Sequence, residues 1–171
     1  SRQKDSDRQP VQIHLIVKEA LKLLRASIPT TIDIKTDIDT HCCLVLADPS
    51  QIHQIVMNLC TNSYHAMRTT GGVLTINMAP LDLDQKAARD ISPELAPGPY
   101  VHLEISDNGH GMDHMTLDRI FEPYFTTKKE GEGTGLGLSV VHNIVKSHGG
   151  HITAESELGK GTTFHAYLPR L

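Results

Sequence analysis

The chain has 171 residues and a formal net charge of −4 at pH 7. This length suits one domain with a hydrophobic core of its own. The acidic balance and the lack of a basic stripe interleaved with aromatic residues exclude a general nucleic-acid-binding surface, so any phosphate recognition must be local.

The first predicted element is an amphipathic helix over residues 11–26. Apolar side chains recur there at helical spacing, and lysine and glutamate lie on the opposite side. We expect the helix to end near Ile28, because proline follows at position 29. The apolar face expected to pack against the rest of the domain contains Val11, Leu15, Ala20, Leu23 and Leu24.

Two strands and a long helix are expected next. Alternating apolar residues predict strands over 31–36 and 43–47. Asp48 and Pro49 are the residue types that begin a helix, an N-cap followed by proline at the first helical position. This helix should run to about Arg68, where two threonines and two glycines end it.

The second half of the chain is predicted to be richer in strands. Residues 79–99 contain four prolines and show no sustained period, so we expect a surface excursion between two paired strands. The alternative is a variable loop without a role. The other expected elements are strands over 73–78, 101–107, 151–155 and 162–168 and a helix from Leu136 to about His148.

This order of elements predicts an α+β fold, a two-layer sandwich in which helices cover one face of a mixed, mostly antiparallel sheet. The three cysteines, two of them adjacent, suit buried thiols in a reducing compartment better than a disulfide framework. No apolar run approaches the roughly 20 residues that cross a bilayer, and the polar first ten residues do not resemble a signal peptide.

Eleven histidines raise the question of a metal site. Cysteine and histidine never occur at the close paired spacings that structural zinc requires. His110 and His114 lie four residues apart in an expected loop, and His148 and His151 flank two glycines. We therefore expect surface or helix-end histidines rather than metal ligands.

Strand parity singles out Asp107. Val101, Leu103 and Ile105 alternate onto the core face of their strand, and Asp107 has the same parity. A carboxylate there costs several kcal/mol unless something donates hydrogen bonds to it. A purine amino group is one such donor, and the backbone of the following Asn-Gly turn is an equally good alternative. Thr162 has core parity on its own strand and could reach the same pocket.

The helix over 49–68 carries a second, polar face. Asn58, Asn62 and His65 follow one another there at helical spacing. Asparagine in mid-helix costs roughly 0.7 kcal/mol against alanine, which suggests a use for the amides. Their oxygens, with water and phosphate oxygens, suit magnesium. The alternative is a solvated polar face.

A glycine-rich run, Gly133-Thr134-Gly135-Leu136-Gly137-Leu138, leads into the helix predicted from Leu136. Free amide protons and the positive end of the helix dipole make such a junction suitable for phosphate, although flexible lids use the same residues. Neither the P-loop pattern nor the Rossmann glycine pattern occurs in this chain.

Four motifs in one order resemble the catalytic, ATP-binding domain of sensor histidine kinases, in the superfamily of gyrase-type ATPases and Hsp90. NLCTN at 58–62 is similar to the N box, and DNGHGM at 107–112 is similar to the G1 box. IFEPYFTTK at 120–128 resembles the F box, and GEGTGLGL at 131–138 resembles the G2 box. The closing strands, 148–169, also match. The resemblance implies the ATP-binding fold named after Bergerat.

The resemblance also implies roles for individual residues. Asp107 would accept from the adenine amino group, with Gly109, Gly111, Met112 and Thr162 around the base. Asn58 and Asn62 would hold magnesium, Asn58 and Lys128 would be catalytic, and His65 would lie near the phosphates. Ser63 departs from the alanine usual in the N box, and this small change should not weaken binding. The expected lid residues that contact the triphosphate or anchor the lid are Phe121, Lys128, Gly133, Thr134, Gly135, Leu136, Gly137 and Leu138.

The domain organisation follows from the same resemblance. Residues 1–9 would be the remnant of a preceding dimerisation hairpin or linker, and residues 10–171 the ATP-binding domain with a lid at about 112–134. His14 lacks the sequence context of a phosphoacceptor, so the accepting histidine would lie on a hairpin outside this chain. The chain alone should therefore bind ATP and magnesium without phosphorylating itself.

The expected partners are the protein's own histidine-containing dimerisation domain and a response-regulator receiver domain, within a homodimeric full-length protein. No nucleic acid and no membrane contact are expected for this piece, and its location would be cytoplasmic, either free or as part of a membrane-bound sensor. The alternatives are a gyrase-like ATPase, a regulatory serine kinase and a nucleotide-sensing module without transfer. Asn58 stands where gyrase-type enzymes usually have a glutamate base, which disfavours hydrolysis.

Overall fold

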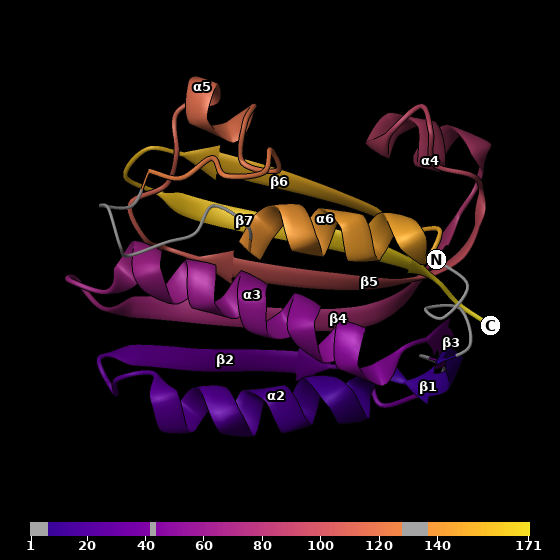
Figure 1. The fold of residues 1–171 in the computed structure, drawn as a ribbon, viewed down its shortest axis with the longest axis horizontal. Helices are drawn as coiled ribbons and strands as arrows, with labels where there is room; N and C mark the ends of the chain where they lie inside the picture. The colour runs from indigo at the N-terminus through magenta and orange to yellow at the C-terminus, as the bar shows by residue number, and fades with distance from the viewer. Residues whose placement is uncertain (1–6, 42–43, 128–136) are drawn as a thin grey trace.

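The computed structural model describes residues 7–41, 44–127 and 137–171. A five-stranded sheet in the order β2-β4-β5-β7-β6 forms one layer, and helices form the other (Figure 1). β2 runs parallel to β4, and all the other pairs in this sheet are antiparallel. The predicted α+β sandwich with a mixed, mostly antiparallel sheet is confirmed. The sheet strands are β2 Ile32–Ile38, β4 Gly72–Leu83, β5 Gly98–Asp107, β6 His151–Glu157 and β7 Gly161–Pro169.

Three long helices lie along one face of this sheet (Figure 1). They are α2 Ile13–Ser27, α3 Pro49–Met67 and α6 Gly137–Ser147, and α3 contacts both of the others. The short strands β1 Gln9–Gln12 and β3 Leu44–Ala47 pair antiparallel near the start of α3. The predicted helix over 49–68 is confirmed, including its start, where Asp48 Oδ1 accepts from the Ser50 backbone N–H at 2.9 Å.

The core lies between the helices and the sheet. On β5, Val101, Leu103 and Ile105 are buried together with Asp107, as strand parity predicts. On β7, Thr162 is buried on the same side as Phe164 and the following alternate residues. The polar residues Asp107 and Thr162 are thus at the ends of two apolar rows, directly opposite each other in the strand register.

The first helix differs from its prediction. It begins at Ile13 rather than at 11, because Val11 belongs to β1. Leu15 and Leu23 were expected on the buried face, but they are 56% and 51% exposed. The buried stripe is set by Ile13, Val17, Ala20 and Leu24 at spacings of four, three and four residues. Leu15 lies on the opposite side of the helix and Leu23 lies beside the stripe.

The segment over 79–99 also differs from the excursion that was expected. β4 continues to Leu83, and a helix, α4 Gln85–Ile91, follows before β5 begins at Gly98. Pro80 is tolerated within β4 because β2 ends opposite Met78, so β4 is an edge strand beyond that point. The segment has a small core of its own, formed by Leu83, Ala88, Leu95, Tyr100 and Tyr167.

The remaining predicted elements are present with shifted ends. The strand expected at 31–36 is shifted to 32–38 as β2, and those expected at 151–155 and 162–168 are two residues longer as β6 and β7. A one-turn helix, α5 His114–Leu117, lies in the segment expected to be mixed. Among the residues that the structure describes, no helix is both long enough and apolar enough to cross a membrane.

Candidate functional site

Asp107 ends β5 with a carboxylate that is only 6% exposed. Its Oδ1 accepts a hydrogen bond from the backbone N–H of Gly109 at 2.9 Å. Its Oδ2 is buried and has no hydrogen-bond partner within the described parts of the chain. The sequence offered two roles for Asp107, holding the following turn and accepting a hydrogen bond from a ligand, and this side chain can fill both. Oδ1 stabilises the turn, while Oδ2 remains an acceptor for an external donor.

Burial and nearby hydrogen-bond donors have opposite effects on the pKa of Asp107. Burial raises the pKa of Asp107 above its ordinary value, and the Gly109 N–H, the Ser63 hydroxyl and the Thr162 backbone counteract the rise. The Ser63 hydroxyl is fully buried and close enough to favour the carboxylate, but it makes no well-aligned hydrogen bond with another described group. A ligand that donates to Oδ2 would further favour the ionised form.

The turn after Asp107 is held by backbone contacts on two sides. His110 N donates to Ala66 O of α3 at 3.1 Å, and His110 O accepts from Gly159 N at 2.7 Å. A Cβ at Gly109 would lie 2.5 Å from Ala66 O, and Gly111 has a φ of 69° with the Glu157 carbonyl against it. Only glycine permits so close an approach at these two positions.

Thr162 lies opposite Asp107, and its hydroxyl is bonded to a residue that the sequence did not single out. Thr162 Oγ1 is 2.8 Å from Ser156 Oγ of β6, and Ser156 Oγ accepts from the Met112 N–H at 2.8 Å. Ser156 also donates to Gly161 O at 3.0 Å. The register of β6 against β7 places Ser156 there, and its parity with Ile152 on β6 was the available signal.

The polar face of α3 belongs to the helix whose Ala66 carbonyl holds the turn after Asp107. Asn58, Asn62 and His65 are all half-buried there. Asn58 Nδ2 donates to Gly137 O, the first residue of α6, at 3.3 Å. The amide oxygen of Asn58 is thereby turned away from Gly137. Two neutral amide oxygens a helical turn apart are ligands that suit magnesium, so the residues present fit that ion.

Residues 118–127, which follow α5, pack on the main core through Phe121 and Phe125. The ring of Phe121 is 5.3 Å from the ring of His142 on α6, and Arg119 lies over Phe125 at 4.5 Å. Leu138 is half-buried against the main core, whereas Gly137 is exposed at the start of α6. His142 is a further residue that the sequence did not single out. The predicted residues Lys128, Gly133, Thr134, Gly135 and Leu136 lie outside the described residues.

The predicted residues that the structure describes fall into two groups. Asp107, Gly109, Gly111, Met112 and Thr162 form a buried acceptor end, and the carboxamides of α3 lie toward the start of α6. A buried acceptor joined to amide oxygens and a helix N-terminus is suited to a purine nucleotide with a metal-bound phosphate chain.

With this sandwich and this site, the chain is an ATP-binding domain of the α+β type. Residues 47–171 match the family described as "Histidine kinase-, DNA gyrase B-, and HSP90-like ATPase". The chain belongs to this family, and within it corresponds to the catalytic ATP-binding domain of two-component histidine kinases.

Sensor kinases are among its similar proteins. The chain is 41% identical over 159 residues to the sensor kinase CckA of Brucella abortus, covering 91% of this chain and 16% of that protein. It is 37% identical over 162 residues to the sensor histidine kinase ZraS of Klebsiella oxytoca, covering 94% of this chain and 31% of that protein. The chain thus spans less than a third of the length of these relatives.

Solved structures agree with the fold. The catalytic domain of the histidine kinase ThkA superimposes with a TM-score of 0.75 at 25% identity, covering 95% of this chain and 97% of that one. Full-length ShkA, solved in complex with AMPPNP, superimposes with a TM-score of 0.71 at 24% identity, covering 95% of this chain and 31% of that one.

Proposed function

We propose that this domain binds ATP with magnesium and donates the γ-phosphoryl group to a histidine on a separate dimerisation domain. The observation that carries the proposal is Asp107, which is buried, has one oxygen bonded to Gly109 and has the other oxygen without a partner in the described structure. A buried carboxylate oxygen without a donor is costly, and the exocyclic amino group of adenine supplies that donor.

At the base end, Asp107 Oδ2 accepts from the adenine amino group. Gly109 and Gly111 keep side chains out of the space against α3 and the β6–β7 turn, so the turn stays in register with the base. Met112 and Thr162 complete this end, both held by Ser156. Guanine presents a carbonyl oxygen where adenine presents the amino group, so this arrangement selects adenine.

At the phosphate end, Asn62 and Asn58 provide amide oxygens for magnesium, and His65 lies one turn further along α3. Gly137 and Leu138 begin α6, whose free N–H groups favour phosphate oxygens. Lys128, Gly133, Thr134, Gly135 and Leu136 complete the lid in this proposal, and Phe121 anchors it on α6.

The chemistry requires placement and charge stabilisation more than covalent help. An imidazole nitrogen of the partner domain forms a bond to Pγ as the bond from Pγ to the β,γ-bridging oxygen breaks, and ADP leaves. Bound magnesium would neutralise the β- and γ-oxygens. Asn58 and Lys128 hold the phosphate chain, and no carboxylate is present at position 58 to activate water, which favours transfer over gyrase-like hydrolysis.

The proposal extends to the whole protein. Residues 1–9 would belong to the linker from the dimerisation domain and residues 10–171 to the ATP-binding domain, with its lid at about 112–134. A homodimer would pass the phosphoryl group to a response-regulator receiver domain in the cytoplasm. Sensor kinases of which this chain matches only a part are consistent with such additional domains.

Radiolabelled ATP tests the proposal. The chain alone should bind ATP with magnesium but acquire no acid-labile, base-stable label. Adding the histidine-containing hairpin of the same protein should give labelled hairpin, and a hairpin in which that histidine is replaced by glutamine should stay unlabelled. Label on His14 of this chain, or rapid phosphate release without a hairpin, would contradict the proposal.

A further inference from the structure

A cluster of three potential metal ligands lies on the face of the sheet that the long helices leave uncovered. His102 and Glu104 are alternate residues of β5 and therefore point to the same side, opposite to Leu103 and Ile105. His165 of β7 is the register partner of Glu104. All three side chains are half-buried, and one ligand atom from each lies within 4.8 Å of the other two.

The distances in the cluster suit a divalent metal. His102 Nε2 lies 2.9 Å from His165 Nδ1, and His165 Nδ1 lies 3.9 Å from Glu104 Oε2. Tetrahedral zinc with bonds of about 2.0–2.1 Å needs its ligand atoms about 3.3 Å apart, a value between these two distances. One proton must lie between the two imidazole nitrogens in the absence of metal. A cation would replace that proton after a small rotation of the rings.

Neighbouring groups orient the two imidazoles. Glu155 Oε2 lies 3.7 Å from His165 Nε2, which is buried without a hydrogen-bond partner among the described residues. A carboxylate at the far ring nitrogen favours the tautomer that leaves Nδ1 free for metal, as in many metal-binding histidines. The Tyr167 ring lies parallel to His102 at 4.9 Å.

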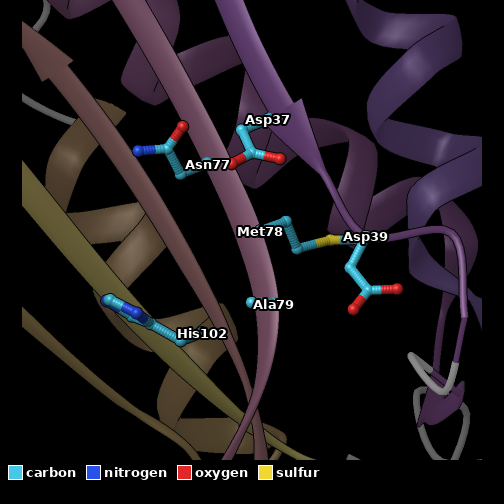
Figure 2. A pocket seen from close by; sticks show the side chains of 6 residues that line it. All are labelled: Asp37, Asp39, Asn77, Met78, Ala79 and His102. Atoms are coloured by element: carbon cyan, nitrogen blue, oxygen red, sulfur yellow. The ribbon is translucent and has the colours of Figure 1, made fainter.

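The sheet leaves space for an ion and its water beside His102. A hollow of about 330 Å³ is lined by Asp37, Asp39, Asn77, Met78, Ala79 and His102. Figure 2 shows Asp37 and Asn77 on the neighbouring strands β2 and β4 and the His102 ring further along the same face. Three protein ligands beside an accessible hollow leave a fourth coordination position open to water or a small ligand.

We propose that His102, Glu104 and His165 form a second cation site, specific for a divalent late first-row metal such as Zn²⁺, on the face of the sheet opposite to the nucleotide site. Two imidazoles and one carboxylate are suitable ligands for zinc, whereas magnesium prefers oxygen ligands. The two histidines are 63 residues apart, which is why close-spacing rules gave no metal site. Only the pairing of β5 with β7 brings them together.

Competition titration of Zn²⁺ against a chromophoric chelator, without nucleotide, tests the site. The unmodified chain should bind one equivalent tightly. His102→Gln and His165→Gln should each weaken that binding by about 100-fold, and Glu104→Gln and Glu155→Gln by about 10-fold. His53→Gln on α3, on the other side of the sheet, is the matched control and should bind as the unmodified chain does.

Circular dichroism without metal establishes that each variant is folded, and Co²⁺ provides a readout on the unmodified chain. Tetrahedral Co²⁺ gives strong visible absorption, which Zn²⁺ should abolish by displacement. Equal Zn²⁺ affinity of the unmodified chain and the His165→Gln variant would overturn the proposal. So would an equal loss in the His53→Gln control, or the absence of Co²⁺ absorption.

Discussion

The two ends of the proposed nucleotide site, the base end at Asp107 and the phosphate end at Asn58 and Asn62, are built in different ways. At the base end, the buried Asp107 is fixed by the Gly109 N–H, and the turn after it is tied by its backbone to α3 and to the β6–β7 turn. At the phosphate end, Asn58 and Asn62 are half-exposed side chains on one helix. The base end is therefore part of the folded core, whereas the phosphate end can change with little effect on the fold. Substitutions at the two ends should separate stability from metal-dependent binding.

The largest expected effect is on stability at the base end. Gly111→Ala places a methyl group against the Glu157 carbonyl at a φ of 69°, and should lower the free energy of unfolding by roughly 3 kcal/mol or more. Gly159→Ala is the control, because Gly159 has a similar φ of 79° but open space around it, and should cost about 1 kcal/mol. Urea unfolding measures both. Equal costs would show that the contact with Glu157 is unimportant.

The next effect is on adenine recognition. Asp107→Asn should weaken ATP binding by roughly 10- to 100-fold, because the amide places a donor or a weaker neutral acceptor against the adenine amino group. Calorimetry with ATP and with GTP measures this, and the preference for ATP should fall as well. Asp33→Asn, at an exposed position of β2, is the control. Unchanged ATP affinity in the Asp107 variant would contradict the assignment of the base end.

A smaller effect is expected at the phosphate end. If the amide of Asn62 ligates magnesium as proposed, Asn62→Ala should weaken ATP binding by about 10-fold when magnesium is present and have little effect in a chelator. Asn77→Ala, on the opposite face of the sheet, is the matched control. Equal weakening with and without magnesium would mean that Asn62 contacts the nucleotide itself.

The smallest effect concerns pH and stability without nucleotide. Since burial raises the pKa of Asp107 above 3.8, the ionised side chain destabilises the folded state, and this cost appears as pH rises from 3.8 through the folded pKa. Asp107→Asn lacks this cost. The free energy of unfolding of the Asp107→Asn variant minus that of the unmodified chain should therefore increase over that pH range, as measured by urea unfolding. A difference that does not vary with pH would indicate that Asp107 has an ordinary pKa.

Local patterns were sufficient for much of this domain. The alternation on β5 and β7 placed Asp107 and Thr162 on the core side, and the cap at Asp48 placed the start of α3. The roles of the site residues stay predictions. Features that depend on the pairing of distant strands were missed, because no local pattern encodes register. Ser156 enters the site only through its pairing with Thr162, and His102 meets His165 only across β5 and β7.

Composition misled the prediction in two places. Four prolines suggested an irregular segment over 79–99, yet it contains the end of β4 and α4. Pro80 lies in the edge part of β4, Pro93 and Pro97 lie between α4 and β5, and Pro99 lies in β5. Of the five residues expected on the buried face of the first helix, Val11, Ala20 and Leu24 are buried, whereas Leu15 and Leu23 remain exposed.

The small hydrophobic cluster around α4 lies beside a turn where the domain should accept an inserted protein or epitope. It lies at the Gly98 end of β5, a full strand length from Asp107, and is a hydrophobic cluster separate from the main core. The turn near Pro97 is exposed, so a fluorescent protein or epitope inserted there would be carried on this appendage rather than on the principal core. Such a reporter could follow nucleotide-dependent encounters between domains while leaving the ATP pocket intact.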